Sequence, residues 1–187
     1  MAAVAPTQKL DRAEYRRRYE LGEIPDNVYL LGGELVPKMP QNSPHAFAVS
    51  LLNRALARVL ALDVAVRCQL PIALSDDSEP EPDLVIARGG ESAFRDHHPT
   101  PPELLLVIEV ADTTALQDRR LKMPRYFAAG IPEVWLVDLA ARLIRRFTPD
   151  PAQLYYRESQ YAPGDELPLP ESETPFMVPA ELFAAPA

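Results

Sequence analysis

The eight residues from Leu104 to Ala111, LLLVIEVA, constrain the fold of this chain most, because all of them except Glu109 are apolar. A continuous apolar run of this length is typical of a strand buried on both faces of an α/β sheet. An ionised carboxylate inside such a strand is costly unless a cation or hydrogen-bond donors meet it there. The run therefore predicts a central strand and makes Glu109 a candidate functional residue.

A second carboxylate, Asp83, begins another apolar segment, in EPEPDLVIA. If the two segments are neighbouring strands, Asp83 and Glu109 emerge at the same edge of the sheet. Mg²⁺ prefers hard oxygen ligands in octahedral geometry and keeps several waters. Two carboxylates and one backbone carbonyl, for which Val110 is the natural donor, would suffice to bind it.

Lys122, in DRRLKMPRY, lies on the next expected helix. An ammonium group there could hold the attacking water, stabilise charge growing on phosphorus or, with a lowered pKa, act as a base. Together, Asp83, Glu109 and Lys122 favour hydrolysis of a phosphodiester. Each alone also has a structural interpretation: a strand start, a core carboxylate paired with an arginine, and a solvated helix residue.

The remaining pattern predicts one α/β domain over 1–187, with a mixed, strongly bent sheet flanked by helices. Helices are expected over 10–21, 44–61 (capped by Ser43), 113–129 (kinked or divided at Pro124) and, briefly, Ala180–Phe183. Strands are expected over 64–74, 82–87, 104–111, 133–138 and 142–148. Hairpins are expected around Gly32–Gly33 and, more weakly, between Leu154–Tyr156 and Gln160–Ala162.

The charge of the chain bears on its partners. A formal net charge of −8 does not suggest a tight, nonspecific grip on a polyanion, although basic residues cluster around 16–18, 119–125 and 142–146. Carboxylates that hold a divalent ion would offset part of the acidity. The charge therefore disfavours nucleic-acid binding without excluding it.

Other residue types exclude several alternatives. The single cysteine, Cys68, allows no internal disulfide and fits a reducing cytoplasm, and no stretch is long and apolar enough to cross a membrane. No GxSxG motif or phosphate-cradling glycine loop occurs, and one cysteine with three scattered histidines gives no zinc-ligand spacing.

Three segments carry a family resemblance: EPEPDLVIA, LLLVIEVADTT and DRRLKMPRYFAAGIPEVWLVDLAAR. With AEYRRRYELGEIP and GGELV, they make the chain similar to the Uma-two family of restriction-endonuclease-like proteins, within the PD-(D/E)xK nuclease-like superfamily. The resemblance implies a restriction-endonuclease-like core, a divalent metal (Mg²⁺ or Mn²⁺) and hydrolysis of DNA. It matches Asp83, Glu109 and Lys122 to the family's acid, acid and lysine. The superfamily's usual lysine position is Ala111 here, so Lys122 would reach the site from a helix.

The resemblance also implies further members of the site. Glu34, just after the glycine pair, would orient Lys122 or bind the metal through water, with an ordinary hairpin-edge charge as the equal alternative. His45 matches the family too, but a surface position at a helix N-terminus is favoured. Gln69 is a weaker helper candidate. Tyr126 lies one turn after Lys122 and is expected to be core.

The leading hypothesis is therefore a metal-dependent endonuclease in which Asp83 and Glu109 hold the metal and Lys122 positions water, leaving 5′-phosphate and 3′-hydroxyl ends. Such enzymes often act as homodimers, so a dimer is expected. The alternative is a non-catalytic nucleic-acid- or protein-binding module that keeps the nuclease fold, and hydrolysis of another phosphoester stays open.

Overall fold

A six-stranded mixed sheet forms the centre of the protein in the computed structural model, which describes residues 9–61, 63–111, 116–152 and 155–184. Its strand order is β3-β4-β5-β6-β7-β8, with β5 and β6 parallel and every other neighbouring pair antiparallel. The strands are β3 (Val64–Cys68), β4 (Leu84–Arg88), β5 (Leu104–Ala111), β6 (Val134–Asp138), β7 (Leu143–Pro149) and β8 (Tyr156–Tyr161). The sheet is therefore mixed, as predicted.

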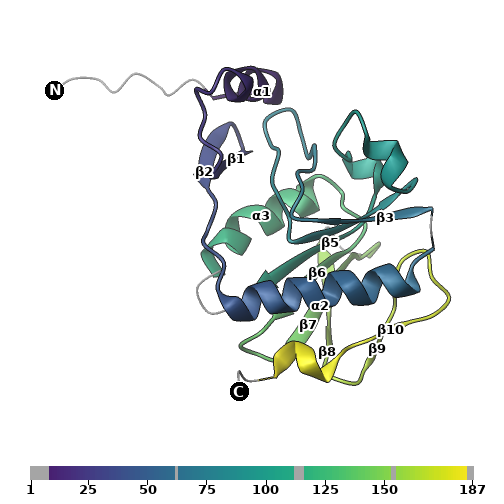
Figure 1. Cartoon of the computed structure of the whole chain (residues 1–187). Helices are drawn as coiled ribbons and strands as arrows, with labels where there is room; N and C mark the ends of the chain where they lie inside the picture. The colour runs from purple at the N-terminus through teal and green to yellow at the C-terminus, as the bar shows by residue number, and fades with distance from the viewer. Residues whose placement is uncertain (1–8, 62, 112–115, 153–154, 185–187) are drawn as a thin grey trace.

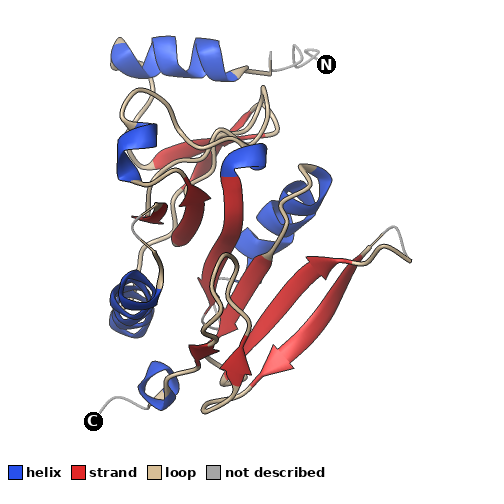
Figure 2. Cartoon of the chain, turned by 90° about the vertical axis from the view of Figure 1, so that its right-hand side faces the viewer, coloured by secondary structure: helices blue, strands red, loops and turns tan. Residues whose placement is uncertain are grey.

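Among the described residues, three α-helices accompany the sheet: α1 (Arg12–Glu20), α2 (Ser43–Val59) and α3 (Leu116–Ala128). Figures 1 and 2 show α2 and α3 on opposite sides of the sheet, with α1 beyond one edge. Two small antiparallel ribbons join β1 (Val28–Leu31) to β2 (Glu34–Pro37) and β9 (Glu166–Leu167) to β10 (Phe176–Met177). The 3₁₀ turns are η1 (Glu91–Phe94), η2 (Pro101–Glu103) and η3 (Ala180–Phe183). None of the helices in these described ranges is long and apolar enough to span a bilayer.

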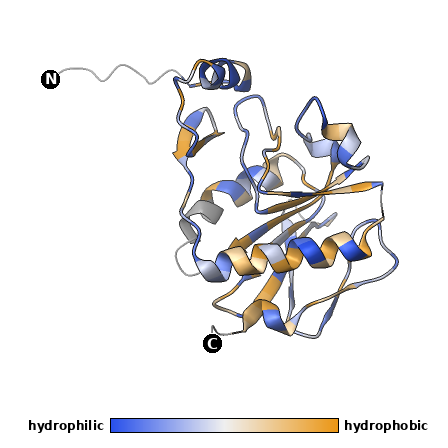
Figure 3. Cartoon of the chain, viewed as in Figure 1, coloured by the Kyte–Doolittle hydropathy of each residue, from blue (hydrophilic) through white to orange (hydrophobic). Residues whose placement is uncertain are grey.

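The central strand β5 is buried along its whole length, as its apolar run predicts. Leu106, Ile108 and Val110 pack in the core under α2, whereas Val107 packs with Tyr126 of α3 on the other face. Figure 3 shows hydrophobic residues concentrated in the strands of the central sheet. Because side chains alternate along a strand, Glu109 belongs to the α3 face.

The α3 helix is the crossover that connects the parallel strands β5 and β6. It runs through Pro124 undivided, and it ends where Gly130 takes φ +71° and the Ile131 N–H donates to the Tyr126 carbonyl. This connection places Lys122, on α3, next to the strand that carries Glu109.

Three local expectations were wrong. The strand expected over 64–74 ends at Cys68, because Gln69 adopts the left-handed region (φ +52°) and the chain then turns away to bridge β1 through Glu79. The helix α2 is capped by Asn42, whose side chain accepts the His45 N–H, and Ser43 is its first residue. The second hairpin does not form, because Tyr156–Tyr161 is one continuous strand paired with β7; Leu154 lies outside the described residues.

We expect the start of β5 to be pH-sensitive through Glu103. Hydrogen bonds, chiefly from the Thr100 hydroxyl, lower the pKa of Glu103 from 4.5 to about 2, outweighing an opposing effect of burial. A carboxylate with a depressed folded-state pKa stabilises the fold above its unfolded-state pKa, and this contribution is lost as the pH falls through the folded-state value. Urea unfolding of wild type and Glu103→Gln should therefore give a stability difference at pH 6 that shrinks at pH 3. An equal difference at both pH values would contradict this.

Candidate active site

The carboxylate of Asp83 is anchored to the central strand by the backbone of β5. The last β4–β5 pair before the site joins Leu84 to Ile108, and Asp83 immediately precedes β4. The Val110 N–H, two residues beyond Ile108, donates to Asp83 Oδ2 at 2.8 Å. The Asp83 carboxylate thus accepts an N–H of β5 that a backbone carbonyl of the neighbouring strand would otherwise accept. The residue that donates this N–H, Val110, is next to Glu109 in β5.

Among the described residues of α3, the side chains of Lys122 and Tyr126 contact the carboxylate of Glu109. Lys122 Nζ lies 3.3 Å from Glu109 Oε1 and 3.4 Å from Oε2, and the Tyr126 hydroxyl donates to Oε1 at 2.6 Å. Lys122 and Tyr126 are four residues apart, so one face of the helix presents both to the same strand residue. Glu109 and Lys122 are each only 4% exposed.

Within the described part of the chain, the buried ammonium of Lys122 contacts three kinds of partner. Besides Glu109, it donates to the Glu81 carbonyl at 3.3 Å and lies 5.2 Å from the centroid of the Tyr29 ring. A buried charge requires this sort of compensation, because desolvation otherwise costs several kcal/mol per ion. The side chain of Lys122 is therefore buried and held by these partners. The alternative interpretation of Lys122 as a solvated helix residue was wrong.

His45 joins the site from the opposite side of the sheet. The Asn42 cap holds the first turn of α2, and His45 Nε2 lies 3.2 Å from Asp83 Oδ2. The His45 side chain is only 12% exposed, so the expected surface position was wrong. Sequence reasoning missed this contact because it depends on how α2 crosses the start of β4.

The other candidates have distinct placements. Glu34 is exposed on β2 opposite Leu31, and within the described residues no hydrogen bond or ion pair joins it to the acidic pair or to Lys122, so its role remains a prediction. Gln69 adjoins the site through its backbone, since its N–H donates to the Asp83 carbonyl at 3.0 Å. Tyr126 is fully buried, as expected, but its hydroxyl serves Glu109.

Cys68 pairs with Leu84 across β3 and β4. Its thiol therefore lies near the carboxylate of Asp83, the residue that precedes Leu84. Burial, and to a lesser degree the negative charge of Asp83, raises the pKa of the Cys68 thiol. A thiol with a raised pKa stays protonated at neutral pH and is a poor nucleophile. The surroundings of Cys68 therefore do not activate its thiol as a nucleophile.

The donor set fits a hard divalent cation. Asp83 and Glu109 offer carboxylate oxygens from neighbouring strands, and the hydrogen bonds of Asp83 found in the described part of the chain all use Oδ2, which leaves Oδ1 for a ligand. No group of three or more histidine, cysteine or acidic side chains with metal-binding geometry occurs among the described residues. Two carboxylates with water completing the shell is an arrangement that Mg²⁺ accepts.

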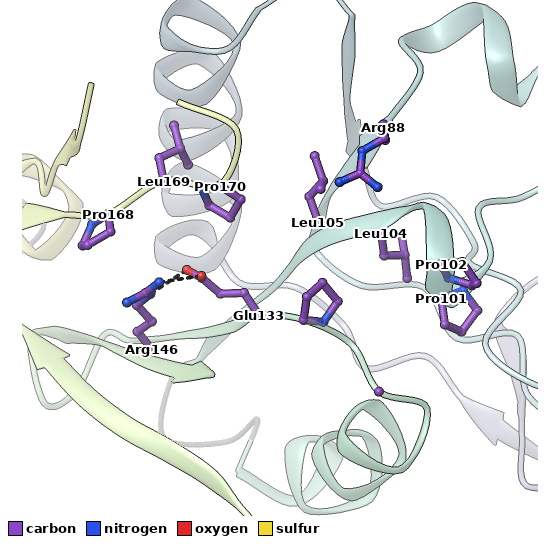
Figure 4. A pocket seen from close by; sticks show the side chains of 12 residues that line it. Arg88, Pro101, Pro102, Leu104, Leu105, Glu133, Arg146, Pro168, Leu169 and Pro170 are labelled. Atoms are coloured by element: carbon purple, nitrogen blue, oxygen red, sulfur yellow. Dashed lines mark hydrogen bonds and ion pairs between the residues drawn. The ribbon is translucent and has the colours of Figure 1, made fainter. Parts of the chain in front are cut away.

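A separate hollow of about 440 Å³ lies near the other end of β5 and is lined largely by prolines and leucines (Figure 4). Its buried carboxylate, Glu133, is held by two hydrogen bonds of 2.8 Å from Arg146 and by the indole N–H of Trp135. Because Arg146 neutralises Glu133 within the protein, this hollow offers no comparable group for metal binding or acid–base chemistry.

The mixed sheet, with its acidic pair and its lysine from the crossover helix, places the protein in the class of nuclease-like α/β proteins. The fold matches a crystal structure titled as "a putative nuclease belonging to DUF820 from Anabaena variabilis", with a TM-score of 0.72 and 15% sequence identity over 93% of this chain and 97% of that chain. At this identity the match establishes the fold, and it confirms the predicted fold class.

The sequence itself matches the Uma2 family model, described as "Putative restriction endonuclease", over residues 12–178. The chain therefore belongs to the Uma2 family, as its resemblance predicts. No curated protein matches the sequence.

We expect the hydroxyl of Tyr126 to contribute to stability through Glu109. Tyr126→Phe removes a hydrogen bond to a buried carboxylate, which should lower the free energy of unfolding by about 2 kcal/mol. Urea denaturation of the metal-free protein measures this. Tyr155→Phe, at a side chain 76% exposed, is the matched control and should change nothing. Equal stabilities of the two variants would show that the contact is energetically neutral.

Proposed function

We propose that this protein is a metal-dependent endonuclease that hydrolyses DNA phosphodiester bonds. The observation that carries the proposal is the convergence of Asp83, Glu109 and Lys122, three ionisable groups that are nearly buried at one end of two adjacent strands. Buried ionisable groups are costly to stability, so their concentration at one place is typical of a functional site.

Asp83 and Glu109 would hold Mg²⁺ or Mn²⁺, with the Val110 carbonyl as a further candidate ligand. A divalent ion so held lowers the pKa of bound water and neutralises charge on the phosphoryl oxygens. The protein's own contribution is positional: the Val110 N–H and His45 fix Asp83, while Tyr126 fixes Glu109. Ligands locked in this way need little reorganisation when the phosphodiester binds.

Lys122 would supply the remaining positive charge. Its ammonium group already lies within 3.4 Å of Glu109, so it can donate to a water or phosphoryl oxygen bound beside that carboxylate. A fixed cation aimed at developing negative charge stabilises the transition state more than the ground state. Its origin on α3 explains why Ala111 can occupy the position that carries the superfamily's usual lysine.

The alternative function is a binding module that keeps the nuclease fold without cleavage. The observations in its favour are the net charge of −8 and the contact of Lys122 with both oxygens of Glu109, an arrangement in which the lysine itself balances the carboxylate. A binding module needs no metal, so metal dependence separates the two functions.

We predict that the wild-type protein nicks supercoiled plasmid in the presence of Mn²⁺ or Mg²⁺ and that Asp83→Asn and Lys122→Met each reduce the rate at least about 100-fold. Agarose-gel conversion of supercoiled to open-circular plasmid measures the rate. Matched controls are Asp165→Asn, in an exposed turn, and Lys9→Met, on the surface; both should nick at the wild-type rate. Nicking that persists in both site variants would exclude this site as its source.

A second prediction concerns metal binding in the absence of substrate. A ligand that binds only the folded state stabilises it, so saturating Mn²⁺ should raise the thermal midpoint of the wild type. Asp83→Asn should lose most of this shift, and Asp165→Asn should keep it. Differential scanning fluorimetry with EDTA as reference measures the shift. A wild type that gains no stability from either metal would favour the binding module.

A further inference from the structure

A second feature beside the catalytic group is a hollow of about 300 Å³ between α1, β1 and the segment that leads into β4. We call it the α1 hollow. Its walls include Tyr15, Arg16 and Tyr19 of α1, with Lys38, Glu79 and His98 across from them. Its volume suits one nucleobase with part of its sugar, and not a duplex.

The α1 hollow adjoins the candidate active site through Glu81. The Glu81 residue lines the hollow, while its backbone carbonyl accepts a hydrogen bond from Lys122. Its side chain in turn pairs with Lys38 at 2.8 Å. A single residue, Glu81, therefore contacts both the hollow and the lysine that would face the scissile phosphate.

One wall of the α1 hollow is aromatic. Tyr15 and Tyr19 are one helical turn apart, with ring centroids 6.4 Å apart, and Tyr19 is 46% exposed. The neighbouring Asp26 carboxylate raises the pKa of Tyr19, so its hydroxyl stays protonated. An exposed ring that packs beside a second ring is a suitable stacking surface for a base, because every base has a π-face.

The charged groups of the α1 hollow include two cations and three carboxylates. Arg16 donates to Glu79 at 2.7 Å and 3.1 Å, Lys38 pairs with Glu81, and Glu20 adds a further carboxylate. Such a lining offers no excess positive charge to a phosphate. It does offer both donors and acceptors, which is what the edge of a base requires.

His98 adds a group that can both donate and accept. Burial lowers the pKa of His98, and the charges of Arg16 and Arg67 lower it further, although Glu79 opposes them. The imidazole is therefore neutral at pH 7, with one ring nitrogen as donor and the other as acceptor.

We propose that the α1 hollow binds one unpaired nucleobase of the nucleic-acid strand next to the scissile phosphate, stacked on Tyr19 with its edge toward Arg16, Glu79 and His98. This subsite would give the protein a preference for single-stranded or distorted DNA, in which a base can leave the helical stack at low cost. The inference rests on the proposed function for its substrate class, but base binding itself does not require cleavage.

The test is binding of a short single-stranded DNA that carries one 2-aminopurine, measured in EDTA so that no strand is cut. Stacking on a tyrosine should quench the 2-aminopurine fluorescence of the complex. Because stacking of one base contributes about 1–3 kcal/mol, Tyr19→Ala should weaken binding about tenfold and abolish the quenching. Tyr19→Phe keeps the ring and should behave as the wild type. Tyr155→Ala, at another exposed tyrosine, should also leave binding unchanged.

Each outcome distinguishes this subsite from the catalytic proposal. If Tyr19→Ala matches the wild type in affinity and quenching, or if the wild type binds no single-stranded DNA, the subsite is excluded, whatever the plasmid assay shows. If binding depends on the Tyr19 ring but neither metal supports nicking, the subsite stands and the catalytic proposal fails. Circular dichroism of Tyr19→Ala confirms that the variant is folded.

Discussion

The burial of Glu109 in the central strand is the constraint on which the rest of the site depends. A carboxylate that is only 4% exposed must be compensated by a cation or by hydrogen-bond donors. Compensation comes from α3, whose Lys122 and Tyr126 meet both carboxylate oxygens. The crossover between two parallel strands therefore does more than connect them: its helix has to lie where its lysine reaches β5, and this fixes α3 against the sheet.

Asp83 has a different role, which is to hold the start of β4 against β5. The Val110 N–H extends beyond the paired part of β4, and Pro82 precedes Asp83, so the chain turns there and the aspartate side chain accepts the orphan N–H. The same oxygen contacts His45, whose helix α2 packs on the other face of the sheet. The two carboxylates thus connect both helical layers, α2 through Asp83 and α3 through Glu109, at one end of the same strand pair.

Local patterns in the sequence predicted much of this arrangement. The apolar run over 104–111 predicted the bounds of β5 correctly, and the acid in its interior indicated that a cation or hydrogen-bond donors meet it there. What failed depended on contacts distant in sequence: the burial of His45 comes from the crossing of α2 over the start of β4, and the bond from Tyr126 comes from the docking of α3. Gln69 ended its strand early through a left-handed backbone that nothing in its own residue type requires.

The distribution of charge limits how this protein could hold DNA. Several arginines are already paired with carboxylates, including Arg16 with Glu79, Arg17 with Glu14 and Arg145 with Glu158. With a formal net charge of −8 as well, the chain offers little excess of the positive charge that gives many nucleic-acid-binding proteins their affinity. Affinity for DNA would then have to come from two local contacts. One is a metal ion held by Asp83 and Glu109, and the other is stacking of a base in the α1 hollow. Stacking in the hollow depends on a deformed or single strand more than on a regular duplex, so an acidic net charge is compatible with a nuclease that selects its substrate by structure.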